Sequence, residues 1–147
     1  MEPSPKPIKV LLIEDNPGDV RLISEAFKNG HGAHRLSVVR DGVQALAFLH
    51  RQGEYGEAPR PDLVMLDLKL PHKDGLEVLR EIKGDAGLRS IPVVVLTTSA
   101  REEDIRRCYE LHANCYVTKR RGLRQFIATV QSIRDFWCKV ANLPPGD

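Results

Sequence analysis

Three acidic side chains follow two short apolar runs in this chain, and their positions point to a chemical site. Residues 10–13 lead into Glu14 and Asp15, and residues 63–66 lead into Asp67. Short runs of branched apolar residues are typical of strands buried on both faces, so each acid lies where a strand leaves its sheet. If the two strands are neighbours, the three carboxylates converge, and they cannot all stay ionised unless a cation or a strong donor lies among them. The pattern therefore predicts a metal ion, a lysine, or both at this edge of the sheet.

Strand and helix patterns alternate along the chain and indicate how these acids are positioned. We expect strands over residues 10–13, 36–39, 62–67, 91–96 and 115–117. Helices are expected to begin near residues 17, 42, 76, 102 and 123, the last continuing past residue 137, and residues 51–61 read as a long loop. Five strands that alternate with five helices predict an α/β fold, in which a doubly wound parallel sheet carries helices on both faces.

In such a fold the ligand site lies beyond the carboxyl ends of the strands. The residues expected there are Glu14, Asp15, Asp67, Thr97, Thr98, Ser99 and Lys119. Asp67 is predicted to act as a nucleophile toward a phosphoryl group, because an aspartate is already ionised at neutral pH and needs no general base. Phosphoryl transfer then depends mainly on alignment and on neutralising charge.

A hard cation and an ammonium group are predicted to neutralise the phosphoryl oxygens. Mg²⁺ prefers oxygen ligands and accepts phosphate oxygens. Lys119 is expected to pair with a second phosphoryl oxygen, and the Thr97 hydroxyl is expected to bond a third. The expected Mg²⁺ ligands are Glu14, Asp15, Asp67 and the backbone carbonyl of Lys69.

Composition excludes several other classes of protein. The 147 residues suit one domain, and the net charge of +2 argues against a nucleic-acid binder. Three cysteines without C-x-x-C spacing argue against a disulfide framework or a zinc site, and they favour a reducing cytoplasm. No apolar run approaches the roughly 20 residues that span a bilayer, and the N-terminus lacks the pattern of a signal peptide.

Several stretches give the sequence a close resemblance to the receiver domains of response regulators in two-component signalling. They read VLLIED at residues 10–15, DLVMLD at 62–67 followed by LP and DG, PVVVLT at 92–97, and YVTK at 116–119. The resemblance runs from Lys9 to about Ile133. Residues 16–19, 97–99 and 111–116, together with the long loop, are further similar to the stand-alone regulators that serve phytochrome-type sensor kinases.

The resemblance implies a flavodoxin-like sheet of strand order 2-1-3-4-5 and a histidine kinase that donates its phosphoryl group to Asp67. It also implies that Thr97 and Tyr116 form a switch pair, in which movement of Thr97 makes room for the tyrosine ring. By the same resemblance, Lys69 and Ser99 occupy positions that in the family tune the lifetime of the phosphoryl group. Arg120 departs from the family, which usually has a cis proline after the lysine, and a non-proline cis bond costs about 2.5 to 4 kcal/mol.

Two alternative functions remain open on the sequence. A phosphohydrolase with an aspartyl-phosphate intermediate normally carries a second acid two residues after the nucleophile, whereas this chain has Lys69. A receiver-like module that binds partners without phosphorylation is favoured if the loop at Arg120 displaces Lys119. The preferred interpretation is a phosphoacceptor signalling protein rather than an enzyme, which acts through a downstream protein and contacts neither nucleic acid nor membrane.

We expect a flexible lead over residues 1–7, a receiver domain over 8–134, and an extension of the last helix with a tail over 135–147. The extension carries apolar residues beyond the length that a receiver needs. Because the domain should already be covered, we expect this surplus to contribute to a homodimer contact. The residues are Phe136, Trp137, Val140 and Leu143.

Overall fold

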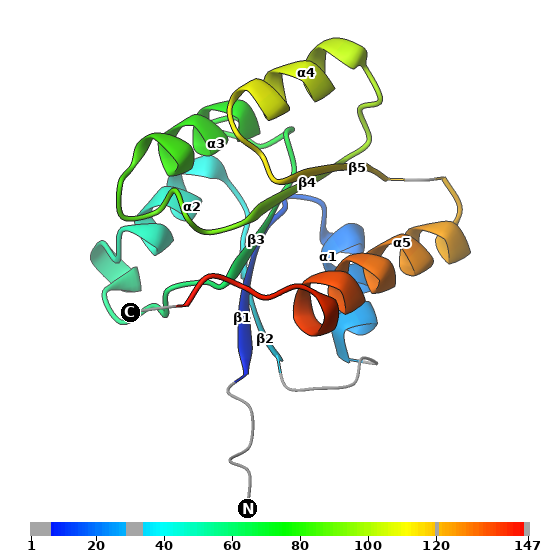
Figure 1. The fold of residues 1–147 in the computed structure, drawn as a ribbon, viewed down its shortest axis with the longest axis horizontal. Helices are drawn as coiled ribbons and strands as arrows, with labels where there is room; N and C mark the ends of the chain where they lie inside the picture. Colours follow the sequence, from blue (N-terminus) through cyan, green and yellow to red (C-terminus); the bar gives the residue numbers. More distant parts are fainter. Residues whose placement is uncertain (1–6, 29–33, 120, 146–147) are drawn as a thin grey trace, which may run out of the picture.

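The fold is a five-stranded parallel sheet between two layers of helices (Figure 1). The computed structural model describes residues 7–28, 34–119 and 121–145. Within those ranges the strands are β1 (Ile8–Ile13), β2 (His34–Val39), β3 (Leu63–Leu66), β4 (Val93–Thr97) and β5 (Cys115–Thr118). They lie in the order β2-β1-β3-β4-β5, which confirms the predicted fold class and strand order.

The helices divide between the two faces of the sheet. Helices α1 (Pro17–Lys28) and α5 (Leu123–Asp135) cover one face. Helices α2 (Gly42–Leu49), α3 (Gly75–Gly84) and α4 (Glu102–Glu110) cover the other. The order of β1 and β3 in the middle of the sheet brings the acids that follow them to the same edge.

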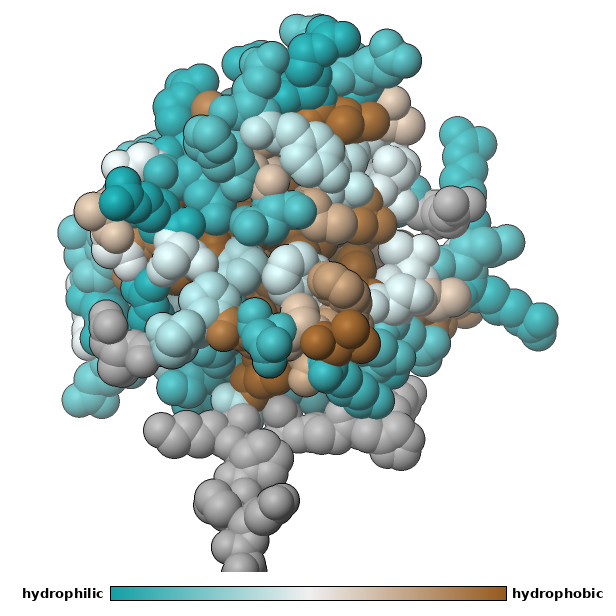
Figure 2. Space-filling view, viewed as in Figure 1, coloured by the Kyte–Doolittle hydropathy of each residue, from teal (hydrophilic) through white to brown (hydrophobic). Residues whose placement is uncertain are grey.

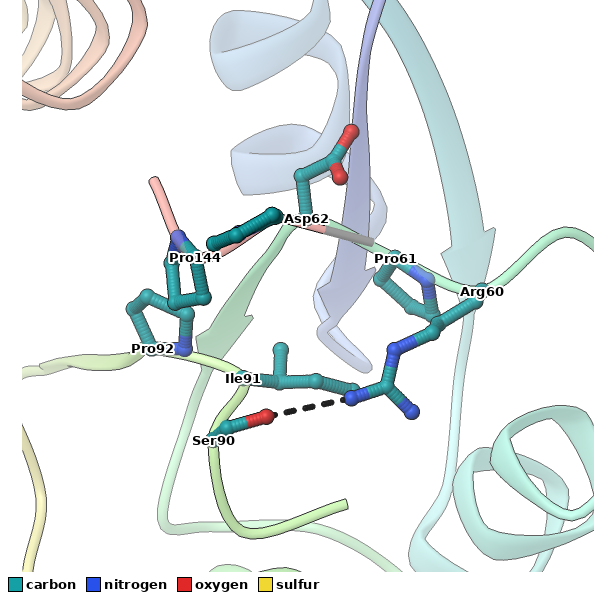
Figure 3. Close-up of a pocket in the computed structure, with 8 residues that line it drawn as sticks. Arg60, Pro61, Asp62, Ser90, Ile91, Pro92 and Pro144 are labelled. Carbon is teal, nitrogen blue, oxygen red and sulfur yellow. Dashed lines mark hydrogen bonds between the residues drawn. The ribbon is translucent and has the colours of Figure 1, made fainter. Parts of the chain in front are cut away.

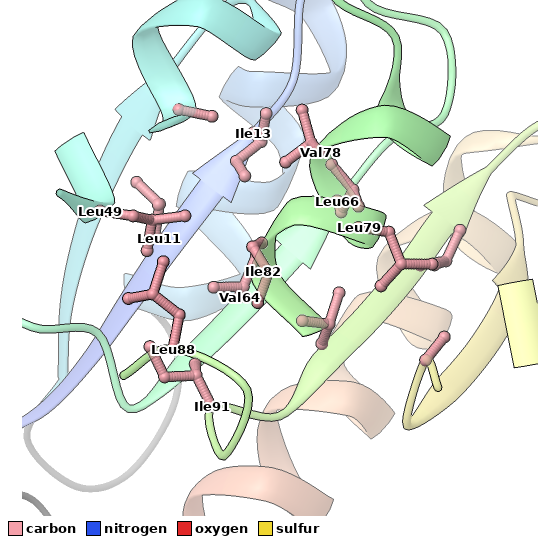
Figure 4. Packing of buried hydrophobic residues seen from close by; sticks show 14 of the residues in the cluster. Leu11, Ile13, Leu49, Val64, Leu66, Val78, Leu79, Ile82, Leu88 and Ile91 are labelled. Carbon is pink, nitrogen blue, oxygen red and sulfur yellow. The ribbon is translucent and has the colours of Figure 1, made fainter. Parts of the chain in front are cut away.

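The alternation of side chains along the central strands fills both interfaces. On the side of α2, α3 and α4, Leu11 and Ile13 of β1 pack with Val64 and Leu66 of β3 (Figure 4). Their neighbours along each strand point the other way, toward α1 and α5. Strands buried on both faces need continuous apolar runs, which is why residues 10–13 of β1 and all four residues of β3 are apolar and buried.

Local signals place the helix starts close to the strand ends. Asp41 accepts a hydrogen bond from the backbone N–H of Gln44 and caps α2, as predicted. Gly75 begins α3 against the end of β3, where a Cβ atom would lie 2.4 Å from the carbonyl oxygen of Asp67. Glycine is required here because the helix backbone approaches the site without room for a side chain.

Some element bounds differ from the predictions. Strand β3 stops at Leu66, and the loop expected over residues 51–61 contains a short 3₁₀ helix, η1 (Gly53–Tyr55). The last α-helix ends at Asp135 and continues as one π-helical turn, η2 (Phe136–Val140), in which the N–H of Ala141 donates to the carbonyl of Phe136. Of the predicted lead over residues 1–7, only Pro7 lies within the described residues.

The C-terminal extension packs partly on its own domain. Trp137 packs against the core that lies between the sheet and helices α1 and α5. We predicted that its apolar surface would be surplus, but the domain itself uses this surface. Phe136 and Val140 remain 50% and 71% exposed. Figure 2 shows hydrophobic residues gathered in the lower middle of one face, where the end of α5 and the tail cross the molecule, within a largely hydrophilic surround. No helix in the described ranges is long and apolar enough to cross a bilayer.

Candidate functional site

A buried lysine forms the centre of the site at the carboxyl ends of the strands. Lys119 follows β5, and its Nζ atom lies 2.6 Å from Glu14 Oε1, 2.8 Å from Asp19 Oδ2 and 2.9 Å from Asp67 Oδ2. All three ammonium protons therefore have a carboxylate acceptor. The lysine side chain is only 5% exposed, so these ion pairs act in a medium of low dielectric.

Lys119 and its three carboxylate partners come from different elements, and three of the four side chains meet because their strands end at the same edge of the sheet. Asp19 comes from the first turn of α1. Glu14 follows β1 and Asp67 follows β3, while Lys119 follows the edge strand β5. The backbone N–H of Lys119 donates to the carbonyl of Thr97 at 2.6 Å, which ties the end of β5 to the end of β4. The predicted convergence of Glu14, Asp67, Thr97 and Lys119 is thus observed.

One carboxylate beside Lys119 was not among the predicted site residues. Asp19 in the first turn of α1 pairs with Lys119, whereas Asp15, predicted as a metal ligand, is exposed. The sequence signal for Asp19 was its position in the first helical turn after the strand-end acids, which we treated only as part of the resemblance. An acid at this position is easily read as a partner of the helix dipole, so its ion pair with Lys119 was missed.

Burial and ion pairing shift the pKa values of the buried acids Glu14 and Asp67 in opposite directions. Burial is the main cause that raises the pKa of Glu14, to about 7, and the nearby charge of Asp67 adds to the effect against the opposing Lys119. Burial also acts to raise the pKa of Asp67, but Lys119 and the backbone N–H of Lys69 outweigh it and hold that pKa below its usual range. Asp67 is therefore ionised at neutral pH, as a nucleophile requires.

The carboxylates around Lys119 offset the effect of burial on the pKa of the lysine. Burial alone would lower the pKa of Lys119, whereas the hydrogen bonds that it donates to Asp19, Glu14 and Asp67 raise it above its ordinary value. The ammonium group therefore stays charged at neutral pH. A permanently charged donor inside a dry site suits the binding of a phosphoryl oxygen.

Thr97 supplies a buried hydroxyl without a hydrogen-bond partner. It ends β4, its side chain is fully buried, and within the described residues Thr97 Oγ1 has no donor or acceptor. A buried polar group that lacks a partner costs free energy, so such a group in a native fold needs an explanation. Thr98, which we also predicted in the site, is exposed at its rim.

Tyr116 points from β5 toward the loop that leaves β4. Its hydroxyl donates to the carbonyl of Ser99 at 2.7 Å, and its ring packs partly against the core beneath α4. Burial is the main cause that raises the pKa of this tyrosine. We call this the inward position of Tyr116, and its role in a switch pair with Thr97 stays a prediction.

The oxygen donors present around Lys119 are of a type that fits a hard divalent cation. In the described part of the chain no three His, Cys, Asp or Glu side chains are already grouped to hold a metal ion. Instead, Lys119 occupies oxygen atoms of Glu14 and Asp67, which are ligands of the type that Mg²⁺ prefers. The N–H of Lys69 donates to Asp67 Oδ1 at 3.1 Å, so the backbone of Lys69 lies beside that carboxylate, and the role of its carbonyl as a ligand stays a prediction.

Two hollows lie near opposite ends of the strands. One of about 340 Å³ opens beside the site between α1 and the start of α5, and its lining includes Asp19, Thr98 and Lys119. The other lies at the amino ends of β3 and β4, where Pro144 of the tail sits near Pro61 and Pro92 (Figure 3). In that hollow Arg60 bonds Ser90 at 3.2 Å. It contains no group of the predicted chemistry.

One predicted feature falls on a residue outside the described ranges. Arg120 carries the departure from the family pattern, and the peptide bond that precedes it is not described. The lysine before it is described, however, and lies within the site. The position of Lys119 removes the reason for expecting a receiver-like module that cannot be phosphorylated.

The chain is similar to one family of proteins in both sequence and structure. Residues 10–131 match the model of the response regulator receiver domain. The response regulator Rcp1 of Synechocystis sp. (strain ATCC 27184 / PCC 6803 / Kazusa) is 51% identical over 138 residues, which cover 94% of each chain. A solved structure of the Mn²⁺-bound form of Rcp1 superposes with a TM-score of 0.93 at 51% identity, covering 95% of this chain and all of that one. The phosphorylated cyanobacterial phytochrome response regulator RcpA gives the same TM-score, identity and coverage.

Proposed function

From the finding that this chain belongs to the response regulator receiver domain family, we propose that Asp67 accepts a phosphoryl group from the histidine of a sensor kinase in a Mg²⁺-dependent reaction. The protein is a response regulator, and therefore a signalling protein. The observation that carries the proposal is the pairing of the ionised Asp67 with Lys119, which follows a strand paired with the one that Thr97 ends. The ammonium group of Lys119 can donate to one phosphoryl oxygen, and the buried hydroxyl of Thr97, which has no partner among the described residues, can donate to another.

The proposed transfer uses groups that the fold already holds in place. A carboxylate oxygen of Asp67 bonds to phosphorus while the bond from phosphorus to the kinase imidazole breaks, and the imidazole keeps the electron pair. Lys119 exchanges carboxylate oxygens for a phosphoryl oxygen, which keeps its charge paired. The Thr97 hydroxyl donates to another phosphoryl oxygen, and this contact would satisfy the buried group.

We propose Mg²⁺ as the resident ion, held by Glu14, Asp15, Asp67 and the carbonyl of Lys69. When bound, the ion neutralises charge on the phosphoryl oxygens. The exposure of Asp15 leaves that carboxylate free to turn toward an ion. Burial and, to a smaller extent, the charge of Asp67 raise the pKa of Glu14, and a divalent cation beside it would favour the ionised carboxylate.

We further propose a phytochrome-type sensor histidine kinase as the partner. The support is the identity of 51% with Rcp1 and with the phytochrome response regulator RcpA. The downstream protein has no such support and stays unidentified. A cytoplasmic location is proposed because Cys108, Cys115 and Cys138 are free thiols.

A homodimer remains a proposal on a smaller surface than the sequence suggested. Phe136 and Val140 are its exposed apolar residues, since Trp137 packs on its own domain. The double variant Phe136→Ser and Val140→Ser keeps the chain length and removes this apolar surface. Light scattering should show a dimer for the wild type and a smaller mass for the variant. A wild type that stays monomeric with and without phosphorylation would contradict the proposal.

Incubation with acetyl phosphate tests phosphorylation directly. The wild type should acquire acid-labile phosphate in the presence of Mg²⁺ and lose this ability on addition of EDTA. Asp67→Asn should incorporate none, while Asp62→Asn, at the opposite end of β3, serves as the matched control and should behave as wild type. Steady release of phosphate from many monoesters would instead favour a phosphohydrolase.

A further inference from the structure

Helix α4 is held to the domain by few apolar contacts. Cys108 is its only fully buried residue, and its first turn carries three acids, Glu102, Glu103 and Asp104. A helix with so little buried apolar surface gains little from packing. Its position therefore depends strongly on hydrogen bonds to the neighbouring strand and loop.

A chain of three hydrogen bonds ties both ends of α4 to Tyr116. Near the end of the helix, Tyr109 Oη accepts a bond from the backbone N–H of Tyr116 at 3.1 Å. The Tyr116 hydroxyl donates to the Ser99 carbonyl at 2.7 Å. The Ser99 hydroxyl in turn donates to Asp104 Oδ2 at 2.6 Å, in the first turn of the helix. We call these four residues the α4 hydrogen-bond chain.

We propose that Tyr109 is a positioning residue, whose hydroxyl holds Tyr116 in its inward position and thereby couples helix α4 to phosphoryl uptake at Asp67. The inference rests on the proposed function, because it assigns a role in that reaction. Tyr109 touches neither Asp67 nor Lys119, and it acts only through the backbone of Tyr116.

The coupling of helix α4 to the site runs through Ser99, which the hydrogen bonds of the chain reach close to Thr97. Ser99 lies two residues after Thr97, whose hydroxyl is the proposed phosphoryl ligand. Loss of the bond at Tyr109 frees the backbone of Tyr116, which weakens the bond from its hydroxyl to Ser99. The loop after β4 is then less ordered, and Thr97 is less often in place when a phosphoryl group arrives.

The substitution Tyr109→Phe removes the acceptor and keeps the ring. Since Tyr109 is 49% exposed, water competes for the bond and a moderate effect is expected. The amide proton of Tyr116 should exchange with solvent about two- to tenfold faster, and the initial rate of labelling by acetyl phosphate should fall by a similar factor, the range that one net hydrogen bond supplies. The affinity for Mg²⁺ should not change, because the metal ligands are untouched.

Tyr55→Phe is the matched control. It removes a tyrosine hydroxyl beside α2, where the ring centroids of Tyr55 and Phe48 lie 5.4 Å apart. It should leave the labelling rate and the exchange rate of the Tyr116 amide proton unchanged. The double variant Tyr109→Phe with Tyr116→Phe should label no more slowly than the slower single variant, because both substitutions break one chain of bonds.

The outcomes separate the inference from the proposed function. Failure of the wild type itself to take phosphate overturns the proposed function. A wild type that labels normally, with Tyr109→Phe equal to Tyr55→Phe, overturns only the role of Tyr109. The role of Tyr109 would also be overturned if the rate losses of the two single variants multiplied in the double variant, because the two residues would then act independently. Faster exchange at all amides, and not specifically at Tyr116, would overturn it as well, because a general loss of stability would then explain the data.

Discussion

Replacing Lys119 by methionine should strongly destabilise the metal-free protein. The substitution keeps most of the side-chain volume but leaves the carboxylates of Glu14, Asp19 and Asp67 without their shared partner. Removing one member of a buried ion pair costs about 3 to 5 kcal/mol. Glu14 can escape part of this cost by taking up a proton, because its pKa is already about 7. We therefore expect a loss of about 2 to 4 kcal/mol at pH 7, carried mainly by Asp67.

Lys83→Met provides the matched comparison. Lys83 is also partly buried and donates three hydrogen bonds, but its acceptors are neutral oxygens of Arg89, Ile91 and Asn114. Its removal leaves no buried anion, so we expect a smaller loss, about 1 to 2 kcal/mol, from unpaired acceptors.

Urea unfolding with and without Mg²⁺ distinguishes the two cases. An ion that binds only the folded state stabilises it by an amount that rises with the logarithm of the ion concentration divided by its Kd. Mg²⁺ should recover more stability in Lys119→Met than in Lys83→Met, since it can neutralise the carboxylates that the lysine leaves behind. If Lys119→Met is as stable as the wild type without metal, or gains no more from Mg²⁺ than Lys83→Met does, the reasoning about the buried cluster is refuted.

Further predictions concern the pH dependence of folding and the approach of α3 to the site. Because the pKa of Glu14 is raised from 4.5 to about 7 in the fold, its contribution to stability is fully present below pH 4.5 and is lost as the pH rises through 7. Unfolding of the metal-free protein should therefore show a loss of about 2 kcal/mol between pH 5.5 and 8 that is absent in Glu14→Gln. Lowering of the Asp67 pKa acts only below pH 4 and does not enter this window. Gly75→Ala should lower the free energy of unfolding by about 1 to 3 kcal/mol, because its Cβ would meet the Asp67 carbonyl; calorimetry showing no change would contradict the close approach.

The sequence predicted the sheet and its site edge because both depend on local patterns. Apolar runs that end at acids define β1 and β3, and glycine or acidic caps define several helix starts, so the parallel sheet and its carboxyl-end site follow from general rules. The strand order was predicted only from the resemblance to receiver domains. Asp67, Glu14 and Lys119 were found because each directly follows a strand.

The missed features depend on side-chain choices that no local pattern encodes. Asp15 and Asp19 are both close to the end of β1, and only the path of the first turn of α1 decides which one reaches Lys119. The packing of Trp137 depends on the π-helical turn η2, which rotates the residues after Asp135 relative to an α-helix. The bond between Tyr109 and the backbone of Tyr116 joins a helix to a strand and leaves no mark on the apolar periodicity.

The crowding of acids around one lysine explains why this site can respond to two ligands together. Lys119 cannot bind a phosphoryl oxygen without leaving at least one of its carboxylates, and Glu14 and Asp67 cannot both remain ionised without a cation near them. A divalent ion held by Glu14 and Asp67 would neutralise these two acids and leave Lys119 available for a phosphoryl oxygen. The ion pair of Lys119 with the more exposed Asp19 would still hold the ammonium group close to the site. Metal binding and phosphoryl uptake are therefore expected to be cooperative, because each relieves the charge imbalance that the other would create.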